Sequence, residues 1–522
     1  MGRYLNRKND MFQQALNSAI YVDKSEMLAF LNGCISTEQK YLCISRPRRF
    51  GKSMTANMLN AYYGIGNDSH NQFDKLIISK DPSYEKYLNH YNVIQINMLD
   101  FLSEGESVTE ILSFLEEDLR EDFDREFEMI RYSSRRTLSR DMDDVYRETG
   151  IPFVIIIDEW DCIFREYPRK FEEQKLYLDY LRNLMKDKPY IALAYMTGIL
   201  PVKKYGAHSA LNMFAEYSMT NQRELSPLTG FTEAEVKELC DRYQMSFDET
   251  KYWYDGYDLN GFSIYNPRSV VMSMTGHIYD NYWTRTETFE ALRKYIVMDF
   301  EGLHDDVTML LAGGEVIVNI NSFANDMTTF EKKDDILTLL IHLGYLAYDF
   351  DRKTVRIPNK EIMEEFETSI SVSGWQEVMN AIGRSEELLA ATLSENEEVV
   401  ADLIEEAHME NASIIRYNDE NSLASVLSIA YYSARKDYVL IREMPSGKGY
   451  ADIVFLPRKN SMNPALVIEL KWDKSVKSAI DQIKERDYPA VLSEYKAPLL
   501  LVGISYDVKT KKHSCRIEKC NS

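Results

Sequence analysis

Cysteine and histidine are scarce in this sequence, and neither is arranged for metal binding or for a disulfide framework. Six cysteines and eight histidines occur among 522 residues. No two cysteines form a CxxC pair, and no Cys/His cluster has the spacing of zinc ligands. Scattered free thiols are typical of a reducing compartment. We therefore expect a cytoplasmic protein without a structural zinc site.

Long apolar runs are also missing. The longest, such as Phe153–Ile157, are far shorter than the roughly 20 residues that a bilayer requires. The first residues lack the apolar core of a signal peptide. We expect no association with a membrane.

Motifs for Ser–His hydrolysis are absent too. The chain has no Gly-x-Ser-x-Gly elbow, and no pair of histidines accompanies a carboxylate at metal-binding spacing. The sequence therefore does not support hydrolase chemistry of that type.

The charge balance is strongly acidic, with a local exception. The net charge of −22 argues against a protein that nucleic acid coats over its whole surface. Charge acts locally, however. Residues 435–522 hold 17 Lys and Arg against 11 Asp and Glu. This favours a nucleic-acid contact near the C-terminus, although basic residues on a small domain are often only a solvated face.

Length and patterning predict an α/β protein of several domains. A chain of 522 residues is too long for one ordinary core, so two to four domains are expected. Strand-like runs alternate with helical patterns up to about residue 230, which predicts a parallel sheet with right-handed crossovers. We divide the chain into an N-terminal α/β domain over 1–230, a helical middle over 231–384 and a C-terminal α/β domain over 385–522.

The middle contains one recognisable pattern, near residues 334–358. A helix is expected over Asp335–Tyr345, followed by strands at Leu346–Phe350 and Thr354–Pro358. A helix followed by such a hairpin looks like a winged helix-turn-helix. Modules of this kind pack internally about as often as they contact DNA.

A glycine-containing loop lies between a predicted strand, Tyr41–Ser45, and a predicted helix, Met54–Tyr63. Its sequence is Arg46-Pro47-Arg48-Arg49-Phe50-Gly51-Lys52-Ser53. Backbone N–H groups and the helix N-terminus would hold a triphosphate, Lys52 would reach the β- and γ-phosphates, and Ser53 would bind Mg²⁺. The usual pattern begins with glycine rather than arginine. The alternative is a basic loop that caps a helix, with Lys52 in solvent.

Two carboxylates follow a second apolar strand. The run Pro152–Ile157 is continuous, as in a strand that is buried on both faces, and it ends in Asp158 and Glu159. Asp158 would hold Mg²⁺ through water, and Glu159 would orient or deprotonate the attacking water. Acids at a strand end can also simply face solvent. The two motifs together predict a nucleotide site.

Further candidates for this site follow the next expected strand, Tyr190–Met196. Thr197 could sense the γ-phosphate, or could simply begin a turn. Arg182 and Arg223 are candidates for a charge-stabilising arginine, and the sequence does not choose between them. The predicted nucleotide-binding residues are Arg48, Arg49, Phe50, Gly51, Lys52, Ser53, Met54, Asp158 and Thr197.

These motifs resemble a bacterial AAA-ATPase-like family related to archaeal-type and signal-transducing P-loop ATPases. The loop, the Ile-Asp-Glu strand end and Thr197-Gly198 carry the resemblance, with Trp253–Tyr257 and Ile264–Pro267 further on. It covers roughly residues 5–285. It implies a P-loop NTPase domain that binds ATP and Mg²⁺ and lacks the first loop glycine.

A third set of charged residues lies on strand-like segments near the C-terminus. Asp452 begins one strand, and Glu469-Leu470-Lys471 ends the next, so a hairpin would bring Asp452 beside Glu469 and Lys471. The two carboxylates and the Leu470 carbonyl could bind Mg²⁺ or Mn²⁺, and Lys471 could position water or offset charge. The alternative is a cross-strand ion pair on a solvated sheet.

This arrangement resembles the PD-(D/E)XK nuclease superfamily, whose fold is that of restriction endonucleases. The matching residues are Asp452, Glu469-Leu470-Lys471 and Gln482, and Glu420 matches the acid of the first helix. The resemblance covers about residues 385–522. It implies Glu420 as a further metal ligand.

Three functions remain open at this point. The first is an ATPase coupled to a metal-dependent nuclease that acts on nucleic acid, DNA more than RNA, with catalytic residues Glu159, Asp452, Glu469 and Lys471. The second is a nucleotide-dependent switch whose inactive nuclease fold recruits a partner. The third is an ATPase that acts on proteins. An oligomer is compatible with all three.

Overall fold

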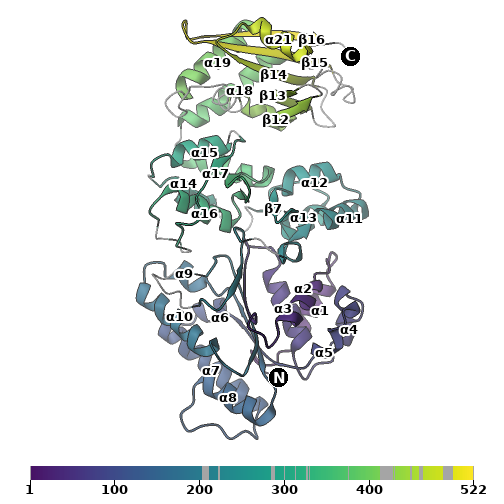
Figure 1. The fold of residues 1–522 in the computed structure, drawn as a ribbon, viewed down its shortest axis with the longest axis vertical. Coiled ribbons are helices and arrows are strands. Elements are labelled where there is room, and N and C mark those ends of the chain that lie inside the picture. The colour runs from purple at the N-terminus through teal and green to yellow at the C-terminus, as the bar shows by residue number, and fades with distance from the viewer. Residues whose placement is uncertain are drawn as a thin grey trace. The chain divides into compact units, whose positions relative to one another are not determined.

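A computed structural model of the chain divides into two compact units. Figure 1 labels the helices and strands named below. Residues 2–202, 211–221, 224–283, 289–298, 300–311, 313–324, 327, 330–373, 376–411, 427, 430–446, 449–457, 463–485 and 498–520 are described. The first unit comprises Met1–Thr288 and Ile317–Glu365, and the second comprises Phe289–Val316 and Phe366–Ser522. No helix in the described part of the chain is long and apolar enough to cross a membrane.

The first unit is built on a five-stranded parallel sheet in the order β2-β3-β4-β1-β5. Its strands are β1 (Tyr41–Ser45), β2 (Asn92–Asn97), β3 (Phe153–Asp158), β4 (Ile191–Gly198) and β5 (Ala215–Tyr217). The α/β fold class is therefore confirmed. The sequence did not predict β5, the short strand at one edge.

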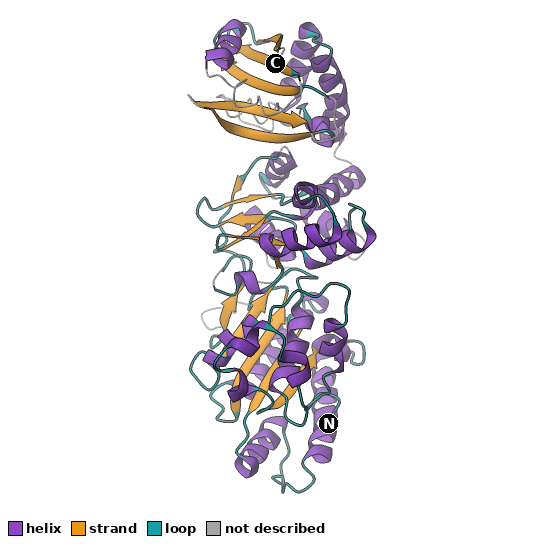
Figure 2. Cartoon of the chain, turned by 90° about the vertical axis from the view of Figure 1, so that its right-hand side faces the viewer, coloured by secondary structure: helices purple, strands orange, loops and turns teal. Residues whose placement is uncertain are grey.

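Helices cover both faces of this sheet (Figure 2). Alternate residues of β3 explain why its sequence is apolar throughout. Ile155 and Ile157 belong to one core cluster, whereas Val154 and Ile156 belong to the cluster on the other face. The helices of this part are α1 (Asp10–Leu16), α2 (Glu26–Cys34), α3 (Lys52–Tyr63), α4 (His70–Phe73), α5 (Tyr84–Tyr87), α6 (Met98–Leu102), α7 (Val108–Glu126), α8 (Leu138–Thr149), α9 (Cys162–Glu166) and α10 (Phe171–Met185).

The rest of the first unit is mainly helical. Its larger elements are α11 (Glu233–Tyr243), α12 (Phe247–Tyr254), β6 (Phe231–Thr232), β7 (Tyr257–Leu259), β8 (Phe262–Tyr265), α13 (Pro267–Gly276), α16 (Lys333–Leu343), β10 (Ala347–Asp349) and β11 (Thr354–Arg356). The hairpin of β10 and β11 directly follows α16. The helix and hairpin expected near 334–358 are thus present.

One buried carboxylate ties several of these segments together. Glu361, near the start of α17 (Lys360–Ser373), accepts hydrogen bonds from the N–H groups of Tyr282 at 2.7 Å and Trp283 at 2.9 Å. The hydroxyl of Ser269 in α13 donates to both of its oxygens, at 3.0 and 2.9 Å. Burial raises the pKa of Glu361 to about 8. This carboxyl is therefore largely protonated at neutral pH.

The second unit contains a mixed five-stranded sheet in the order β12-β13-β14-β15-β16. Only β14 and β15 pair in parallel. Core clusters lie on both faces of the sheet, one with α18 and α19 and the other with α21. The elements are α14 (Phe289–Ile296), α15 (Leu303–Leu311), α18 (Gln376–Leu393), α19 (Glu397–Asn411), β12 (Tyr438–Ser446), β13 (Gly449–Pro457), β14 (Ala465–Trp472), α21 (Val476–Glu485), β15 (Leu499–Asp507) and β16 (Lys512–Cys520).

The raised pKa of Glu361 predicts a specific pH dependence of stability. Because the folded state holds this proton more tightly than the unfolded chain, stability should fall as pH rises from about 4.5 to about 8. We expect the Glu361→Gln variant to lack this component. Urea unfolding at several pH values would measure it.

The matched control is Glu364→Gln, which alters a carboxylate on the same helix that pairs with Lys360 at 3.0 Å near the surface. This variant should show the same dependence of the free energy of unfolding on pH as the wild type. The same slope for wild type and Glu361→Gln would contradict the assignment.

Candidate functional site

The predicted phosphate-binding loop connects β1 to α3. Gly51 occupies the N-cap position of α3 with φ +86°, and Arg49 also has a positive φ of 68°. Glycine suits the first of these positions because residues with a Cβ rarely adopt that conformation. The loop therefore turns tightly into the helix, and the N-terminus of α3 opens onto it. The strand-loop-helix context expected from the sequence is present.

Lys52 lies inside this loop. Its ammonium group donates to the carbonyl oxygens of Arg46 at 3.0 Å and Pro47 at 2.9 Å, and the residue is 8% exposed. Burial lowers the pKa of Lys52, while the nearby carboxylates of Glu159, Asp161 and Asp158 oppose that shift. The alternative of a lysine held in solvent does not describe this residue.

Arg46 replaces the usual first glycine with a structural side chain. The residue is 1% exposed. Its guanidinium donates to Thr229 Oγ1 at 2.9 Å, to the Ser45 carbonyl at 2.9 Å and to the Tyr217 carbonyl at 3.1 Å. Burial lowers its pKa to about 10. Arg46 thus joins the loop to the end of β5 and to the segment before β6.

The end of β3 brings the predicted acids to the same place. Asp158 is 4% exposed, and burial raises its pKa, whereas a hydrogen bond with the Ser53 side chain lowers it. Glu159 has a left-handed φ of 53°, and its N–H donates to Asp158 Oδ1 at 3.0 Å. Ser53 and Asp158, the two predicted ligands of Mg²⁺ at this site, are therefore in contact.

Two charged residues that the sequence did not single out complete this cluster. Arg165 of α9 forms an ion pair with Glu159, and its Nε lies 3.6 Å from Asp161 Oδ2. Asp161 is fully buried and accepts from the N–H groups of Ile199 at 3.1 Å and Leu200 at 2.9 Å. In the sequence, the only local sign of Asp161 is its place in the string Asp158-Glu159-Trp160-Asp161. Arg165 thus lies between the carboxylates of Glu159 and Asp161.

Thr197 lies on β4 directly beside Asp158 in the register of β3 and β4. The residue is fully buried, and its hydroxyl makes no hydrogen bond within the described residues. A buried hydroxyl usually has a partner. Thr197, the predicted γ-phosphate sensor, thus lies near the acids, and its hydroxyl is available for a hydrogen bond to a ligand.

A pocket of about 610 Å³ opens over the loop. The residues predicted from the sequence that line it are Arg48, Arg49, Phe50, Gly51, Lys52, Ser53, Met54 and Glu159, and most of them are polar or charged. Its apolar part is formed by side chains from distant segments, namely Ile20, Tyr21, Val22, Leu228, Phe231 and Val271. An apolar wall beside phosphate-binding groups suits a nucleotide base. No local motif marks these residues, so the sequence could not identify them.

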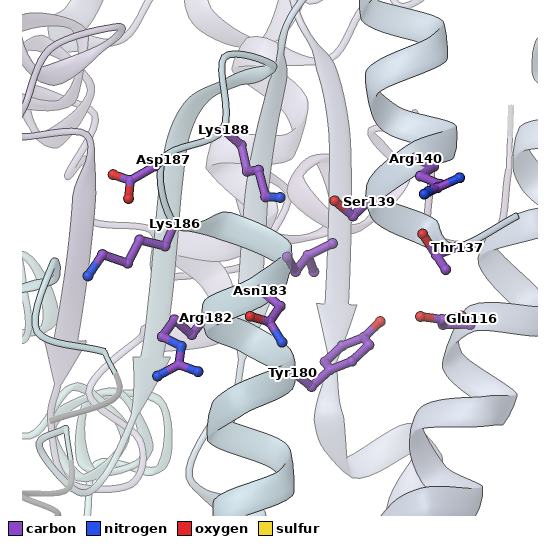
Figure 3. A pocket seen from close by; sticks show the side chains of 11 residues that line it. Glu116, Thr137, Ser139, Arg140, Tyr180, Arg182, Asn183, Lys186, Asp187 and Lys188 are labelled. Carbon is purple, nitrogen blue, oxygen red and sulfur yellow. The ribbon is translucent and has the colours of Figure 1, made fainter. Parts of the chain in front are cut away.

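A second pocket, of about 810 Å³, shares no lining residue with this site. Figure 3 shows the side chains that line it. It lies among side chains of α7, α8 and α10 and of the segment before β4. The phosphate loop follows the carboxyl end of β1, whereas Lys186, Asp187 and Lys188 of this pocket precede the start of β4. The two pockets therefore lie at opposite ends of the parallel strands. Arg182 lines this second pocket and pairs with Asp179 at 3.1 Å, and it is not part of the nucleotide pocket. Arg223 lies outside the described residues.

In the second unit, the predicted C-terminal residues come together on β13 and β14. These strands pair antiparallel with Ile453 opposite Ile468, which puts Asp452 across from Glu469. Lys471 Nζ lies 3.1 Å from Glu469 Oε1, and the side-chain amide of Gln482 in α21 donates to the same oxygen. Asp452 Oδ2 accepts from the N–H of Leu470 at 2.7 Å. The expected hairpin is confirmed.

The donor set at this second site fits a hard divalent cation only in part. Two carboxylates and a backbone carbonyl are the oxygen ligands that Mg²⁺ and Mn²⁺ take. Among the described residues, however, no three His, Cys, Asp or Glu side chains are grouped to hold a metal ion. The predicted third acid, Glu420, lies outside the described residues. The side chains of Glu469 and Lys471 are buried, at 1% and 7% exposure.

Two family models match this chain, one in each unit. Residues 10–207 match the model described as predicted AAA-ATPase. Residues 418–515 match the PD-(D/E)XK nuclease superfamily. The chain carries an AAA-ATPase-like domain and a PD-(D/E)XK nuclease-like domain. Both resemblances inferred from the motifs are thereby confirmed.

A curated relative and several solved structures are also similar. An uncharacterized protein in the vnfD 5' region of Azotobacter chroococcum mcd 1 is 26% identical over 285 residues, which are 51% of each chain. This chain thus spans about half the length of that relative. Cdc6p from Pyrobaculum aerophilum (12% identity, TM-score 0.27) and the Aeropyrum pernix ORC2 protein (13%, 0.31) each align with 70% of this chain, over 99% and 98% of their own lengths.

The role of Arg46 can be tested by restoring the usual glycine. We expect Arg46→Gly to lower the free energy of unfolding of the first unit by about 2–4 kcal/mol, because the buried Tyr217 carbonyl and Thr229 hydroxyl lose their donor. Urea unfolding followed by fluorescence measures this. The control is Arg48→Gly, whose side chain is exposed. Equal stability of Arg46→Gly and wild type would contradict the structural role.

The two parts of the nucleotide pocket should respond differently to substitution. We expect Lys52→Ala to weaken ATP binding roughly 10- to 100-fold, because a charge-assisted contact with phosphate is lost. Tyr21→Ala should weaken ATP and ADP binding equally, by roughly 2- to 10-fold, because it removes an aromatic wall for the base. Calorimetry with ATP, ADP and tripolyphosphate separates the effects. Weaker tripolyphosphate binding by Tyr21→Ala would contradict its assignment to the base.

Proposed function

We propose that this chain binds and hydrolyses ATP in its first unit and cleaves nucleic acid, DNA more than RNA, by metal-dependent phosphodiester hydrolysis in its second. One observation supports the nuclease function. Paired strands and α21 bring Asp452 together with Glu469, Lys471 and Gln482. ATP binding would control access to the nucleic acid. The division at residues 1–230, 231–384 and 385–522 is part of this proposal.

At the nucleotide site, each charged group has a distinct task. The N–H groups of the loop and of the first turn of α3 bind the phosphates, and the Lys52 ammonium exchanges its contacts with Arg46 and Pro47 for phosphate oxygens. Ser53 and Asp158 would hold Mg²⁺, since their side chains already meet. Thr197 supplies a buried hydroxyl near the γ-phosphate.

Glu159 is the general base or water-orienting group, and Arg165 positions it. In the structure the Glu159 carboxylate is paired with Arg165. Water activation requires this carboxylate to turn toward the γ-phosphate. Because Asp161 remains near Arg165, the guanidinium keeps a compensating negative charge when Glu159 leaves it. Hydrolysis therefore includes a local exchange of ion pairs.

At the nuclease-like site, Asp452, Glu469 and the Leu470 carbonyl would hold a divalent ion, with Glu420 as a further ligand. Such an ion, when bound, polarises the phosphate and promotes formation of hydroxide. Lys471 holds the attacking water or offsets charge that develops on the phosphate. Gln482 orients Glu469 through its side-chain amide. Glu469 and Lys471 must exchange their mutual contact for these partners.

A second function also has a specific observation in its favour. The Glu469 carboxylate is buried and accepts from both Lys471 and Gln482, and Asp452 accepts from a backbone N–H. A site closed by its own contacts would suit a nucleotide-dependent switch whose nuclease fold recruits a partner. Cleavage that depends on Glu469 and Lys471 distinguishes the two functions.

A cleavage assay tests the leading proposal. Linear and circular DNA, and RNA, are incubated with Mg²⁺ or Mn²⁺, with and without ATP. We expect Glu469→Ala/Lys471→Ala to reduce cleavage by about 10²- to 10⁴-fold, because metal binding and water positioning are lost together. Lys52→Ala should leave the cleavage site intact and remove the effect of ATP.

The control is Lys237→Ala, which removes an exposed lysine of α11 that pairs with Glu233 in the first unit. It should cleave at the wild-type rate. If no nucleic acid is cleaved under any condition while ATP still binds, the nuclease proposal is wrong and the nucleotide-dependent switch takes its place as the proposed function.

A further inference from the structure

Three aromatic rings lie side by side at one end of the nuclease-like sheet. Trp472 on β14 pairs with Tyr506 on β15, and Tyr506 pairs with His513 on β16. The ring centroids are 4.8 Å apart in both pairs, at interplanar angles of 40° and 43°. Residues paired on neighbouring strands share a face. We call Trp472, Tyr506 and His513 the aromatic ladder.

The ladder extends beyond the apolar core of its face. On the same face, Leu470 and Ile504 belong to the core cluster with α18 and α19, and both are fully buried. Two residues later, Trp472 and Tyr506 are only partly buried. Val508, in the turn that follows, is 44% exposed. Part of the Trp472 and Tyr506 side chains therefore remains in contact with solvent, whereas His513 is only 6% exposed.

Five exposed lysines lie within five residues of a ladder residue in the sequence, namely Lys474, Lys477, Lys509, Lys511 and Lys512. One acid also lies beside the ladder, because the Glu405 carboxylate of α19 accepts from the N–H of His513 at 3.4 Å. None of the five lysines is in an ion pair among the described residues, although Lys509 is near enough to Asp507 to help lower the pKa of that carboxyl. This differs from most of the acidic chain, whose net charge is −22. Lys477 lies in the first turn of α21, which has no acidic residue, although the helix dipole disfavours a cation there. A local electrostatic cost of this kind is expected where a negative ligand binds.

The turn between β15 and β16 presents three of these lysines in a defined way. Asp507 Oδ1 accepts from the N–H groups of Lys509 at 2.8 Å and Thr510 at 2.9 Å, which holds the pKa of Asp507 below its usual value. The N–H of Lys511 donates to the Asp507 carbonyl at 2.8 Å. The single acid of the turn therefore shapes the backbone, and the lysine side chains project from it.

The ladder begins directly after the proposed catalytic residues. Glu469 and Lys471 lie on β14 and contact α21 through Gln482, whereas Trp472 belongs to the opposite face. Successive residues of a strand point to opposite faces. Because β14 ends at Trp472, a strand of nucleic acid bound to the rings would pass around this end of the sheet to reach Lys471 on the other face.

We propose that the aromatic ladder and its five lysines bind unpaired nucleotides and deliver a single strand to the Asp452–Glu469–Lys471 centre. This inference rests on the proposed nuclease function and names the form of its substrate. Stacking on a side chain requires a free face of the base, which an intact duplex does not offer. Lysines alone would bind the phosphates of either form. The rings are what favour a single strand.

The test is binding of labelled oligonucleotides to the full chain without divalent metal, measured by fluorescence anisotropy. The probes are 20-nucleotide single-stranded DNA and RNA of the same sequence and the blunt DNA duplex. We expect Trp472→Ala to weaken binding of single strands by roughly 5- to 100-fold and to leave duplex binding unchanged. Trp472→Phe, which keeps a ring, should retain most of the affinity.

The lysines are tested in a separate variant. The proposal therefore remains testable if the Trp472→Ala protein fails to fold. Lys509→Ala/Lys511→Ala/Lys512→Ala should weaken binding and reduce the slope of log affinity against log salt by about 2. Lys519→Ala, an exposed lysine toward the other end of β16, is the matched control and should bind as wild type.

The outcomes separate this inference from the proposed function. Equal losses for single strand and duplex in Trp472→Ala, or unchanged binding in all variants, would overturn the ladder. Selective single-strand binding without cleavage in Mg²⁺ or Mn²⁺ would retain the ladder and overturn the nuclease. Cleavage by the wild-type chain, together with unchanged single-strand binding by Trp472→Ala, would retain the nuclease and overturn the ladder.

Discussion

The carboxyl ends of parallel strands meet at one edge of a sheet, and the whole nucleotide site depends on this constraint. β1 ends at the phosphate loop, β3 ends at Asp158 and β4 ends at Thr197 and Gly198. Their parallel pairing brings these three ends together although more than 150 residues separate the first from the last. Loss of this pairing would separate Lys52 from the acids, whatever the loop itself retained.

Arg46 shows how a departure from a common motif is accommodated. The guanidinium fills the space beside the loop and binds Thr229 and the Tyr217 carbonyl, so the loop is attached to its surroundings by three hydrogen bonds. Other contacts extend from the same loop. Phe50 packs edge-on against Tyr257 at 5.6 Å, and the Tyr257 hydroxyl donates to the Gly344 carbonyl at 2.5 Å. A series of contacts through Phe50 and Tyr257 thus connects the phosphate loop to Gly344, the residue that follows α16, within the first unit.

The nuclease-like domain uses antiparallel pairing for an equivalent purpose. A hairpin brings Asp452 from one strand and Glu469 with Lys471 from the next to one face, where α21 adds Gln482. The other face carries the core with α18 and α19, and it ends in the aromatic ladder. A single strand, β14, therefore supplies residues to the cluster, the core and the ladder, because its side chains alternate between faces.

The sequence by itself determined the α/β class, the main strands and the two charged clusters, because each depends on local patterns. The apolar run that ends in Asp158 and the loop with Gly51 and Lys52 are readable without any tertiary contact. Strand and helix boundaries differ by only one to two residues at β2, β3 and the start of α3. β5 and β16 escaped prediction, as did the short strands β6, β7 and β8, which form a small sheet in the segment predicted to be helical. β16 alternates exposed polar residues with few buried ones, so it has little apolar signal.

Only the tertiary structure decided which distant side chains complete the sites. Tyr21, Phe231 and Val271 share a pocket wall because separate segments fold over the loop. Arg165 meets Glu159 because of the way the chain turns from β3 into α9. Burial likewise sets the pKa of Lys52 and of Glu361, which no spacing in the chain can express. Local periodicity specifies the element on which a residue lies, whereas its long-range neighbours and its exposure to water depend on how the elements pack.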